Sequence, residues 1–299
     1  MSTIATTVIT PNRRRHASFA TFVVISSLVF YKTLSALVMY SLHDDSSSHI
    51  ILIPFVALYL LYAERQSVFS VTRASVGLGV CVTVGGLILY WLANRNPFPQ
   101  DGNWPLSLVT FSVILTWMGG FILCYGPVAL RAGAFPLLFL LLMVPIPDPV
   151  LDRVIHALQE GSTEIAYLIF QALGIPVLRQ GFLLSLPGVT IEVAKECSSI
   201  RSSMALFITC LLAAHFFLRT GCRMLLLVLL SFPLSLIKNG VRIATLTLLS
   251  IYVDPGFLTG RLHHEGGFVF YLMAMLMLWP VVVWLRKSEK PQGAVNSPV

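Results

Sequence analysis

Long apolar runs separated by short polar stretches dominate this 299-residue chain. A helix needs about 20 mostly apolar residues to cross the roughly 30 Å hydrocarbon core of a bilayer. The runs predict about eight transmembrane helices, so we expect an all-α polytopic membrane protein. The predicted spans are residues 17–40, 48–63, 76–94, 105–125, 132–147, 200–218, 223–252 and 268–285.

Composition supports a membrane environment. Hydrophobic residues make up 56% of the chain and charged residues 11%, with a mean hydropathy of +0.82. That leaves too little polar surface for a soluble globule. The formal net charge of +7 would suit a nucleic-acid-binding protein, but the basic residues are scattered between apolar runs. We therefore expect the lipid bilayer, and not nucleic acid, as a partner; the sequence leaves the oligomeric state open.

Lysine and arginine mark the cytoplasmic loops by the positive-inside rule. The first apolar run follows a basic segment but is too long for a cleavable signal peptide, so it predicts a membrane helix. Both termini come out cytoplasmic, which requires an even number of spans. The basic residues that carry this inference are Arg13, Arg14, Arg15, Arg65, Arg73, Arg131, Arg219, Arg223, Arg286, Lys287 and Lys290.

The segment 148–196 combines short apolar runs with polar residues, and counting it as a span would break the charge pattern. Its first part has one polar and one apolar helical face, which predicts an amphipathic helix at the membrane interface. Two short runs around Pro187-Gly188 then predict a β-hairpin, so we expect a small extracytoplasmic subdomain. The polar face consists of Asp152, Arg153, His156, Gln159 and Glu160, and the apolar face of Val150, Leu151, Val154, Ile155 and Leu158.

These patterns predict one integral membrane domain, 1–299. The first five spans occupy 17–147, the helix and hairpin occupy 148–196, and spans six to eight occupy 197–286. A flexible cytoplasmic tail, 287–299, is expected to follow.

Cys197 lies in the stretch VAKECSSIRSS, where a polar segment enters an apolar run. Ser198 is a helix N-cap type, so the thiol is expected beside a helix N-terminus, whose exposed N–H groups favour the thiolate. Arg201, four residues on, adds positive potential from the same helical face. This pattern predicts a nucleophilic cysteine; the alternative is a small hydrophobic residue at a membrane boundary. The five cysteines lack framework spacing and predict no disulfide scaffold.

Arg242 lies inside an apolar run, where an unpaired arginine costs at least about 2.5 kcal/mol. Counted at about 1.5 Å per residue from Arg223 at the inner face, it lies roughly 28 Å up, near the outer boundary and the depth expected for Cys197. Asn239 completes a polar patch beside it. The alternative is an arginine that snorkels to the outer headgroups, with Lys238 beside it.

His263 and His264 precede the last span, on the same outer side as Cys197. Together, cysteine, histidine and arginine supply a nucleophile, a proton acceptor and an oxyanion donor for acyl transfer. No metal is expected, because no H-E-x-x-H follows and adjacent histidines face different sides of a helix. No phosphate-binding motif occurs, so no cofactor is expected. His49 in the first outer loop could contribute to the site, or it belongs to a solvated loop.

Over most of the chain, these motifs resemble the exosortase/archaeosortase family of integral membrane transpeptidases. The resemblance implies that Cys197 is the nucleophile, Arg242 the intramembrane arginine and His263 the histidine, with His264 as the alternative. The shared elements are the stretch SSSHIILIP, a Gly-Ile-Pro-Val segment with the hairpin, Cys-Ser-x-Ile-Arg at 197–201, a Pro…Asn-x-x-Arg stretch ending at 242, and a final histidine before Gly267.

The resemblance also implies a substrate class. Its members act on membrane-anchored proteins that carry a C-terminal sorting signal: a short motif such as Pro-Glu-Pro, a membrane helix and a basic tail. Such a tail stays in the cytoplasm by the positive-inside rule, which leaves the motif at the outer boundary. The implied protein is a cysteine-type protease or transpeptidase of the bacterial inner membrane, with a thioester intermediate and an active site facing the periplasm.

The chain departs from the family pattern at Ser199 and Ile50, where glycine is common. Neither change removes a catalytic group, but Ser199 alters how closely a substrate can approach the backbone. Two other functions stay open on the residues alone: a transporter that binds anions through Arg242, and a scaffold in which Cys197 is replaceable. A transporter would need polar groups along a whole pathway, whereas here they gather in the outer half of the last three spans.

Overall fold

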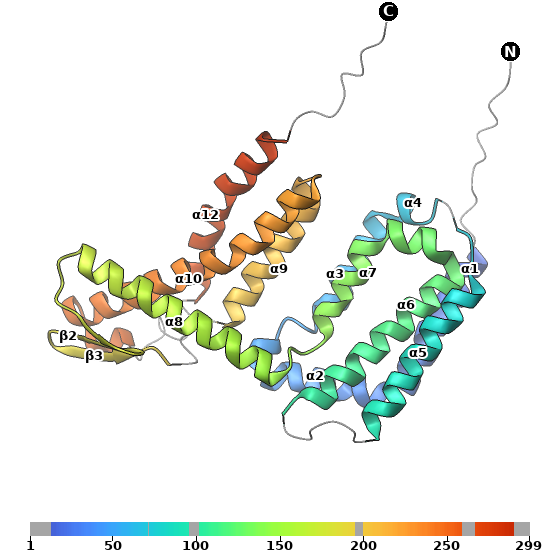
Figure 1. The fold of residues 1–299 in the computed structure, drawn as a ribbon, viewed down its shortest axis with the longest axis horizontal. Helices are drawn as coiled ribbons and strands as arrows, with labels where there is room; N and C mark the ends of the chain where they lie inside the picture. Colours follow the sequence, from blue (N-terminus) through green and yellow to red (C-terminus); the bar gives the residue numbers. More distant parts are fainter. Residues whose placement is uncertain (1–12, 71, 96–101, 195–199, 259–266, 290–299) are drawn as a thin grey trace, which may run out of the picture. The chain divides into compact units, whose positions relative to one another are not determined.

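The computed structural model describes residues 13–70, 72–95, 102–194, 200–258 and 267–289. It divides the chain into two compact units, Met1–Val150 and Leu151–Val299, each with its own hydrophobic core. Most of the described residues are helical, in agreement with the predicted all-α class (Figure 1).

The first unit is built from helices of very different lengths. The helices are α1 (Arg13–Val29), α2 (Tyr31–His43), α3 (Ile53–Ala63), α4 (Arg65–Val68), α5 (Val76–Asn94), α6 (Trp104–Ala132) and α7 (Ala134–Phe139), with 3-10 turns η1 (Asp45–Ser47) and η2 (Leu140–Met143).

Glycine lets α5 and α6 approach closely in this unit. A methyl group at Gly86 would collide with Thr116 of α6, and one at Gly119 would collide with Thr83 of α5. Small residues at such positions are typical of helices that pack inside a membrane, where backbones must come close for van der Waals contact. Gly126 kinks α6 with φ 88°, a value that glycine adopts without strain.

The second unit combines three long apolar helices with a small sheet. Helix α8 (Asp148–Ala172) leads into it, and the sheet comes before the remaining helices (Figure 1). The strands are β1 (Leu178–Gln180), β2 (Leu183–Leu186) and β3 (Val189–Glu192), and the later elements are α9 (Ile200–Phe217), α10 (Gly221–Tyr252), η4 (Pro255–Leu258) and α12 (Gly267–Lys287).

Two cores hold the second unit together. Helices α9, α10 and α12 share an apolar core that includes Leu206, Cys210, Leu227 and Leu278. The sheet is antiparallel in the order β1-β2-β3, and β2 and β3 lie on either side of Pro187-Gly188, where the sequence predicts a hairpin. Its buried side packs against α8 and α10 through Leu184, Leu186, Val193, Ala166, Phe170, Ile243 and Ala244.

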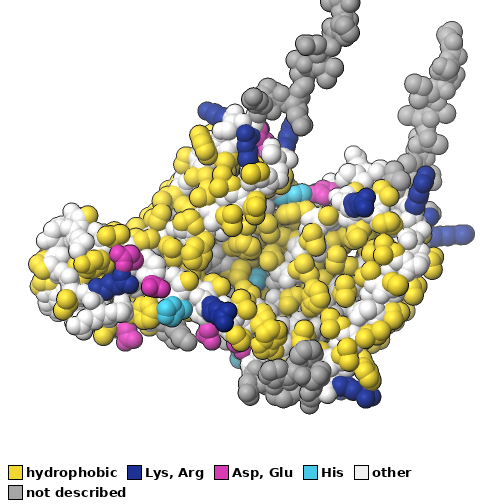
Figure 2. All heavy atoms as spheres, in the orientation of Figure 1, with side chains coloured by type: hydrophobic (Ala, Val, Ile, Leu, Met, Phe, Trp, Pro, Cys, Tyr) yellow, Lys and Arg dark blue, Asp and Glu magenta, His cyan; other side chains and the backbone are white. Residues whose placement is uncertain are grey.

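Hydrophobic side chains cover much of the visible surface of both units, as expected for helices that face lipid (Figure 2). Five described helices are long and apolar enough to cross a membrane: α5, α6, α9, α10 and α12. The count rises to seven if the bent pairs α1–α2 and α7–α8 each form one span. The expected eight spans remain a prediction, because α3, within the predicted span 48–63, has only 11 residues.

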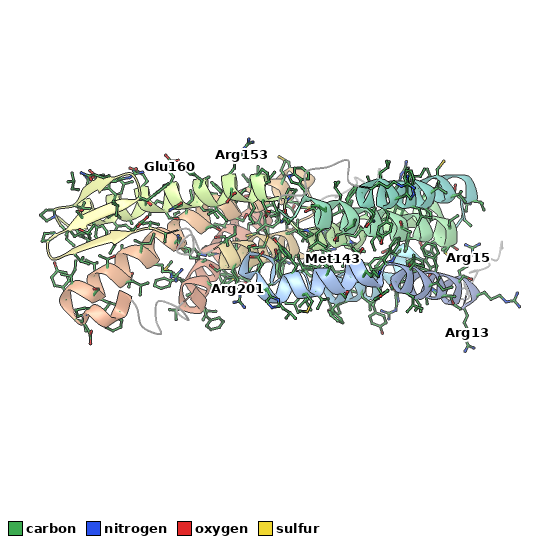
Figure 3. All side chains as sticks on the ribbon, turned by 90° about the horizontal axis from the view of Figure 1, so that it is seen from below. Arg13, Arg15, Met143, Arg153, Glu160 and Arg201 are labelled. Carbon is green, nitrogen blue, oxygen red and sulfur yellow. The ribbon has the colours of Figure 1, made fainter. Side chains whose placement is uncertain are left out.

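Helix α8 differs from the expectation in one informative way. It is continuous for 25 residues, and Arg153 and Glu160 project from its exposed face as predicted (Figure 3). Gln159, expected on that same polar face, is instead buried, with 6% of its surface exposed. The helical periodicity places it beside Glu160, but its amide donates to the backbone of Val193 at the end of the sheet, a contact that one-dimensional periodicity cannot anticipate.

Candidate functional site

A polar patch interrupts the apolar helix α10 inside the second unit. Lys238, Asn239 and Arg242 are 1%, 1% and 9% exposed. Lys238 and Arg242 stand four residues apart, so they lie on one face of the helix, one turn apart. The burial of Arg242 argues against the interpretation that it snorkels to the headgroups, because snorkelling keeps the charged end in water.

Lys238 connects this patch to the start of α9. Its ammonium group donates a hydrogen bond to the hydroxyl of Ser202, in the first turn of that helix. Lys238, which as a neighbouring cation had made snorkelling of Arg242 plausible, is one of the largest fully buried side chains among the described residues. An amine buried this deeply needs a polar partner, and the Ser202 hydroxyl provides one.

One side of the first turn of α9 is buried in the protein and the other is exposed. Ser203 is buried at 7% exposure and Ser202 is half-buried, whereas the Arg201 side chain is exposed (Figure 3). Arg201 was expected to share a helical face with Cys197. Its exposure means that any potential it contributes is screened by solvent, so it is a weaker electrostatic partner than the buried Arg242.

A second buried hydrogen bond holds the end of the sheet. The side-chain amide of Gln159 donates to the carbonyl oxygen of Val193, the residue after β3. The Val193 amide donates to the carbonyl of Phe182 at 3.0 Å, which extends the pairing of β2 and β3 by one residue. Thr163 donates to the backbone carbonyl of Gln159 at 2.7 Å. Val193 is thereby fixed from two sides, by α8 and by β2.

Among the predicted site residues, Arg201, Asn239 and Arg242 belong to the described part of the second unit. The remaining ones there, Cys197, Ser198, His263 and His264, lie outside the described residues. The structure thus brings the arginine patch of α10 to the first turn of α9, just after the stretch that carries Cys197 in the sequence. Nothing in the sequence pattern singled out Gln159 or Lys238 as the side chains that organise this region.

His49 belongs to the first unit, in the turn before α3. Burial lowers the pKa of its imidazole, and hydrogen bonds with the backbone of Ser46 and Leu142 offset part of that effect. In the adjoining stretch, Ser46 and Ser47 are buried, so this part of the loop is shielded from solvent. Burial raises the pKa of Asp44, but hydrogen bonds from the amide and hydroxyl of Ser46, together with those from Ser47 and Tyr40, outweigh it and lower that pKa.

Within the described ranges, no group of three or more histidine, cysteine, aspartate or glutamate side chains is arranged to hold a metal ion. Among the cysteines that the structure describes, Cys210 is buried in the core of α9, α10 and α12. Cys81 and Cys222 are exposed and Cys124 is partly buried. These four thiols are free, so each can be replaced without breaking a disulfide.

The comparisons with known proteins give a family. A family model described as transmembrane exosortase matches residues 40–280, which includes the α10 patch, the first turn of α9 and the positions of Cys197 and His263. The search of curated proteins and the search of solved structures find no match. Because the family model covers most of the chain, this protein belongs to the transmembrane exosortase family.

Proposed function

We propose that this membrane transpeptidase cleaves a C-terminal sorting signal from exported, membrane-anchored proteins, with Cys197, Arg242 and His263 as its catalytic residues. The observation that carries the proposal is the burial of Arg242 on α10, in a patch hydrogen-bonded to the first turn of α9. A guanidinium in an apolar bundle is costly. A buried arginine can offset its desolvation cost by stabilising negative charge that develops during a reaction, because such stabilisation is strongest at low dielectric.

The chemistry follows the thiol-protease pattern. The Cys197 thiolate attacks the carbonyl carbon of the scissile peptide bond, a C–S bond forms, and the carbonyl oxygen becomes an oxyanion. Arg242 would donate hydrogen bonds to that oxyanion. As the intermediate collapses, the C–N bond breaks and His263, with His264 as the alternative, gives its proton to the leaving amine. The upstream part of the substrate is left as a thioester.

Release completes the cycle. An acceptor amine or a water molecule attacks the thioester carbonyl while the histidine takes its proton, and the C–S bond breaks to return the Cys197 thiolate beside the protonated histidine. The basic tail of the substrate would stay on the cytoplasmic side by the positive-inside rule, which leaves the scissile bond at the outer boundary. This orientation agrees with termini in the cytoplasm and an active site facing the periplasm of a bacterial inner membrane.

Processing of a reporter tests the proposal. The reporter is an exported domain followed by a Pro-Glu-Pro-type motif, a membrane helix and a basic tail, and its cleavage is followed by gel mobility in cells that express the protein. Cys197→Ala should abolish cleavage, whereas Cys222→Ala, which removes an exposed thiol at the start of α10, should leave it intact. Cleavage that continues in Cys197→Ala would exclude Cys197 as the nucleophile.

A further inference from the structure

Two hydrogen bonds with buried donors flank the stretch 195–199, one on each side. On the upstream side, the Gln159 amide of α8 donates to the carbonyl of Val193. On the downstream side, the Lys238 ammonium of α10 donates to the hydroxyl of Ser202. Both donors are side chains, both come from other helices, and both are almost completely buried, at 6% and 1% exposure.

Both donors carry a desolvation cost that an apolar side chain at the same position would avoid. Lys238 occupies a place where an apolar side chain of similar volume would avoid the cost of burying an amine. Arg242, one turn further along α10, adds a like charge on the same face and makes the position still less favourable for a second cation. Gln159 likewise stands in the α8 position that the adjacent sheet covers, where a hydrophobic residue would pack without needing a partner.

We propose that Gln159 and Lys238 are positioning residues for the reaction. They hold Val193, before the stretch 195–199, and Ser202, after it, and so restrain both ends of the stretch that carries Cys197 in the sequence. Lys238 is the more informative of the two, because it binds the first turn of α9 to the α10 face that also carries Arg242. The inference rests on the proposed function, since it assigns these side chains a role through Cys197.

Positioning matters because acyl transfer is sensitive to geometry. The sulfur must approach the carbonyl carbon to about 3–3.5 Å along a defined direction, and a displacement of about 1 Å can lower the rate by a factor of about 100. A thiolate is also favoured only while its sulfur lies close to exposed amide groups or positive charge. Loosening either hydrogen bond should therefore change the reactivity of Cys197 as well as turnover.

The test measures Cys197 directly and needs no substrate. The full-length chain carries Cys197 as its only thiol, after replacement of Cys81, Cys124, Cys210 and Cys222 by alanine. In intact cells, the rate of labelling by a membrane-impermeant maleimide is followed from pH 5 to 10. The variants are Lys238→Met, Lys238→Arg, Ser202→Ala and Gln159→Leu, with Lys287→Met as the control for loss of an exposed cation at the end of α12.

The proposal predicts that Lys238→Met, Ser202→Ala and Gln159→Leu each move the apparent pKa of labelling toward about 8.5 and lower the rate at pH 7 by about tenfold. Lys238→Arg should recover most of the loss, because it keeps a donor and a charge at the same place. Lys287→Met should label like the parent. Ser202→Ala leaves the charge of Lys238 in place, so its effect does not come from loss of that charge.

Each outcome decides one question. If Cys197 of the parent has an ordinary thiol pKa or does not label, the proposed function fails. If the parent has a lowered pKa but Ser202→Ala and Gln159→Leu label like it within about twofold, the positioning role fails while the function stands. A shift in Lys238→Met alone would assign Lys238 an electrostatic effect and also overturn the proposal. Thermal unfolding shows whether Lys238→Met is folded; if it is not, Ser202→Ala decides.

Discussion

Gly240 offers a sharp test of how the second unit is packed beside the proposed site. It lies in α10 between Asn239 and Arg242, where that helix meets α8. A methyl group built there would lie 2.5 Å from Cγ2 and 2.7 Å from Cβ of Ile165, and 3.2 Å from the backbone oxygen of Ser162. Ordinary contacts between carbon atoms are about 3.5–4.0 Å, so α8 would have to move by about 1 Å.

We predict that Gly240→Ala destabilises the protein by about 1–2 kcal/mol. Overpacking of this kind costs about 1–3 kcal/mol, and the better helix propensity of alanine returns up to about 1 kcal/mol. The movement would also shift α8 and hence the Gln159 hydrogen bond to Val193, so reporter cleavage should fall together with stability.

The measurement is thermal unfolding of the purified protein in detergent, compared with Gly221→Ala. Gly221 begins the same helix, and nothing lies within 4 Å of a methyl group at that position. Gly221→Ala should therefore be neutral or slightly stabilising. If Gly240→Ala unfolds at the same temperature as the parent or above it, the close approach of α8 and α10 is wrong.

Three further predictions concern single side chains. Arg242→Gln should lower the rate of reporter cleavage by about 10²–10³-fold at unchanged protein level, as loss of an oxyanion donor does; cleavage within about threefold of the parent would remove Arg242 from the mechanism. Because the pKa of His49 lies below its ordinary value of 6.5, its contribution to stability is present above that pH and is lost as pH falls. His49→Gln should therefore reduce the fall in unfolding temperature between pH 7 and pH 5, and an equal fall in variant and parent would contradict this contribution. The backbone amides of Arg219 and Thr220 donate to the Glu289 carboxylate at 2.9 Å each and lower its pKa, so its contribution to stability is present above about pH 4.5 and is lost as pH falls further. Glu289→Gln should therefore unfold at a lower temperature than the parent at pH 7 but not at pH 3.5. Equal unfolding temperatures of the two proteins at both pH values would rule out this contribution.

The sequence predicted the long helices well because an apolar run of about 20 residues has few alternatives to a membrane-spanning helix. The predicted spans 76–94 and 200–218 agree with α5 and α9 within one residue at each end. The predicted span 17–40 is instead broken at Phe30 into α1 and α2, with a bend of 76°. No proline or glycine marks that break, so hydropathy alone could not locate it.

The organisation of the site was harder to predict, because it depends on contacts between distant segments. Arg242 was identified from its cost in an apolar run, which is a local property of the sequence. The bond between Lys238 and Ser202 joins residues 36 positions apart, and the bond between Gln159 and Val193 joins residues 34 apart. The two donors, Lys238 and Gln159, looked like ordinary polar residues at their own positions, and only the packing of the folded chain shows what they bind.

The proposed mechanism requires a thioester between Cys197 and the substrate. Mass spectrometry of the protein isolated from cells that express the reporter, with and without hydroxylamine, which cleaves thioesters, detects it directly. We expect a peptide in which Cys197 carries the upstream part of the reporter, lost on treatment and absent from Cys197→Ala. Reporter cleavage in Cys197→Ala, or cleavage in the parent through an adduct at another residue, would contradict it.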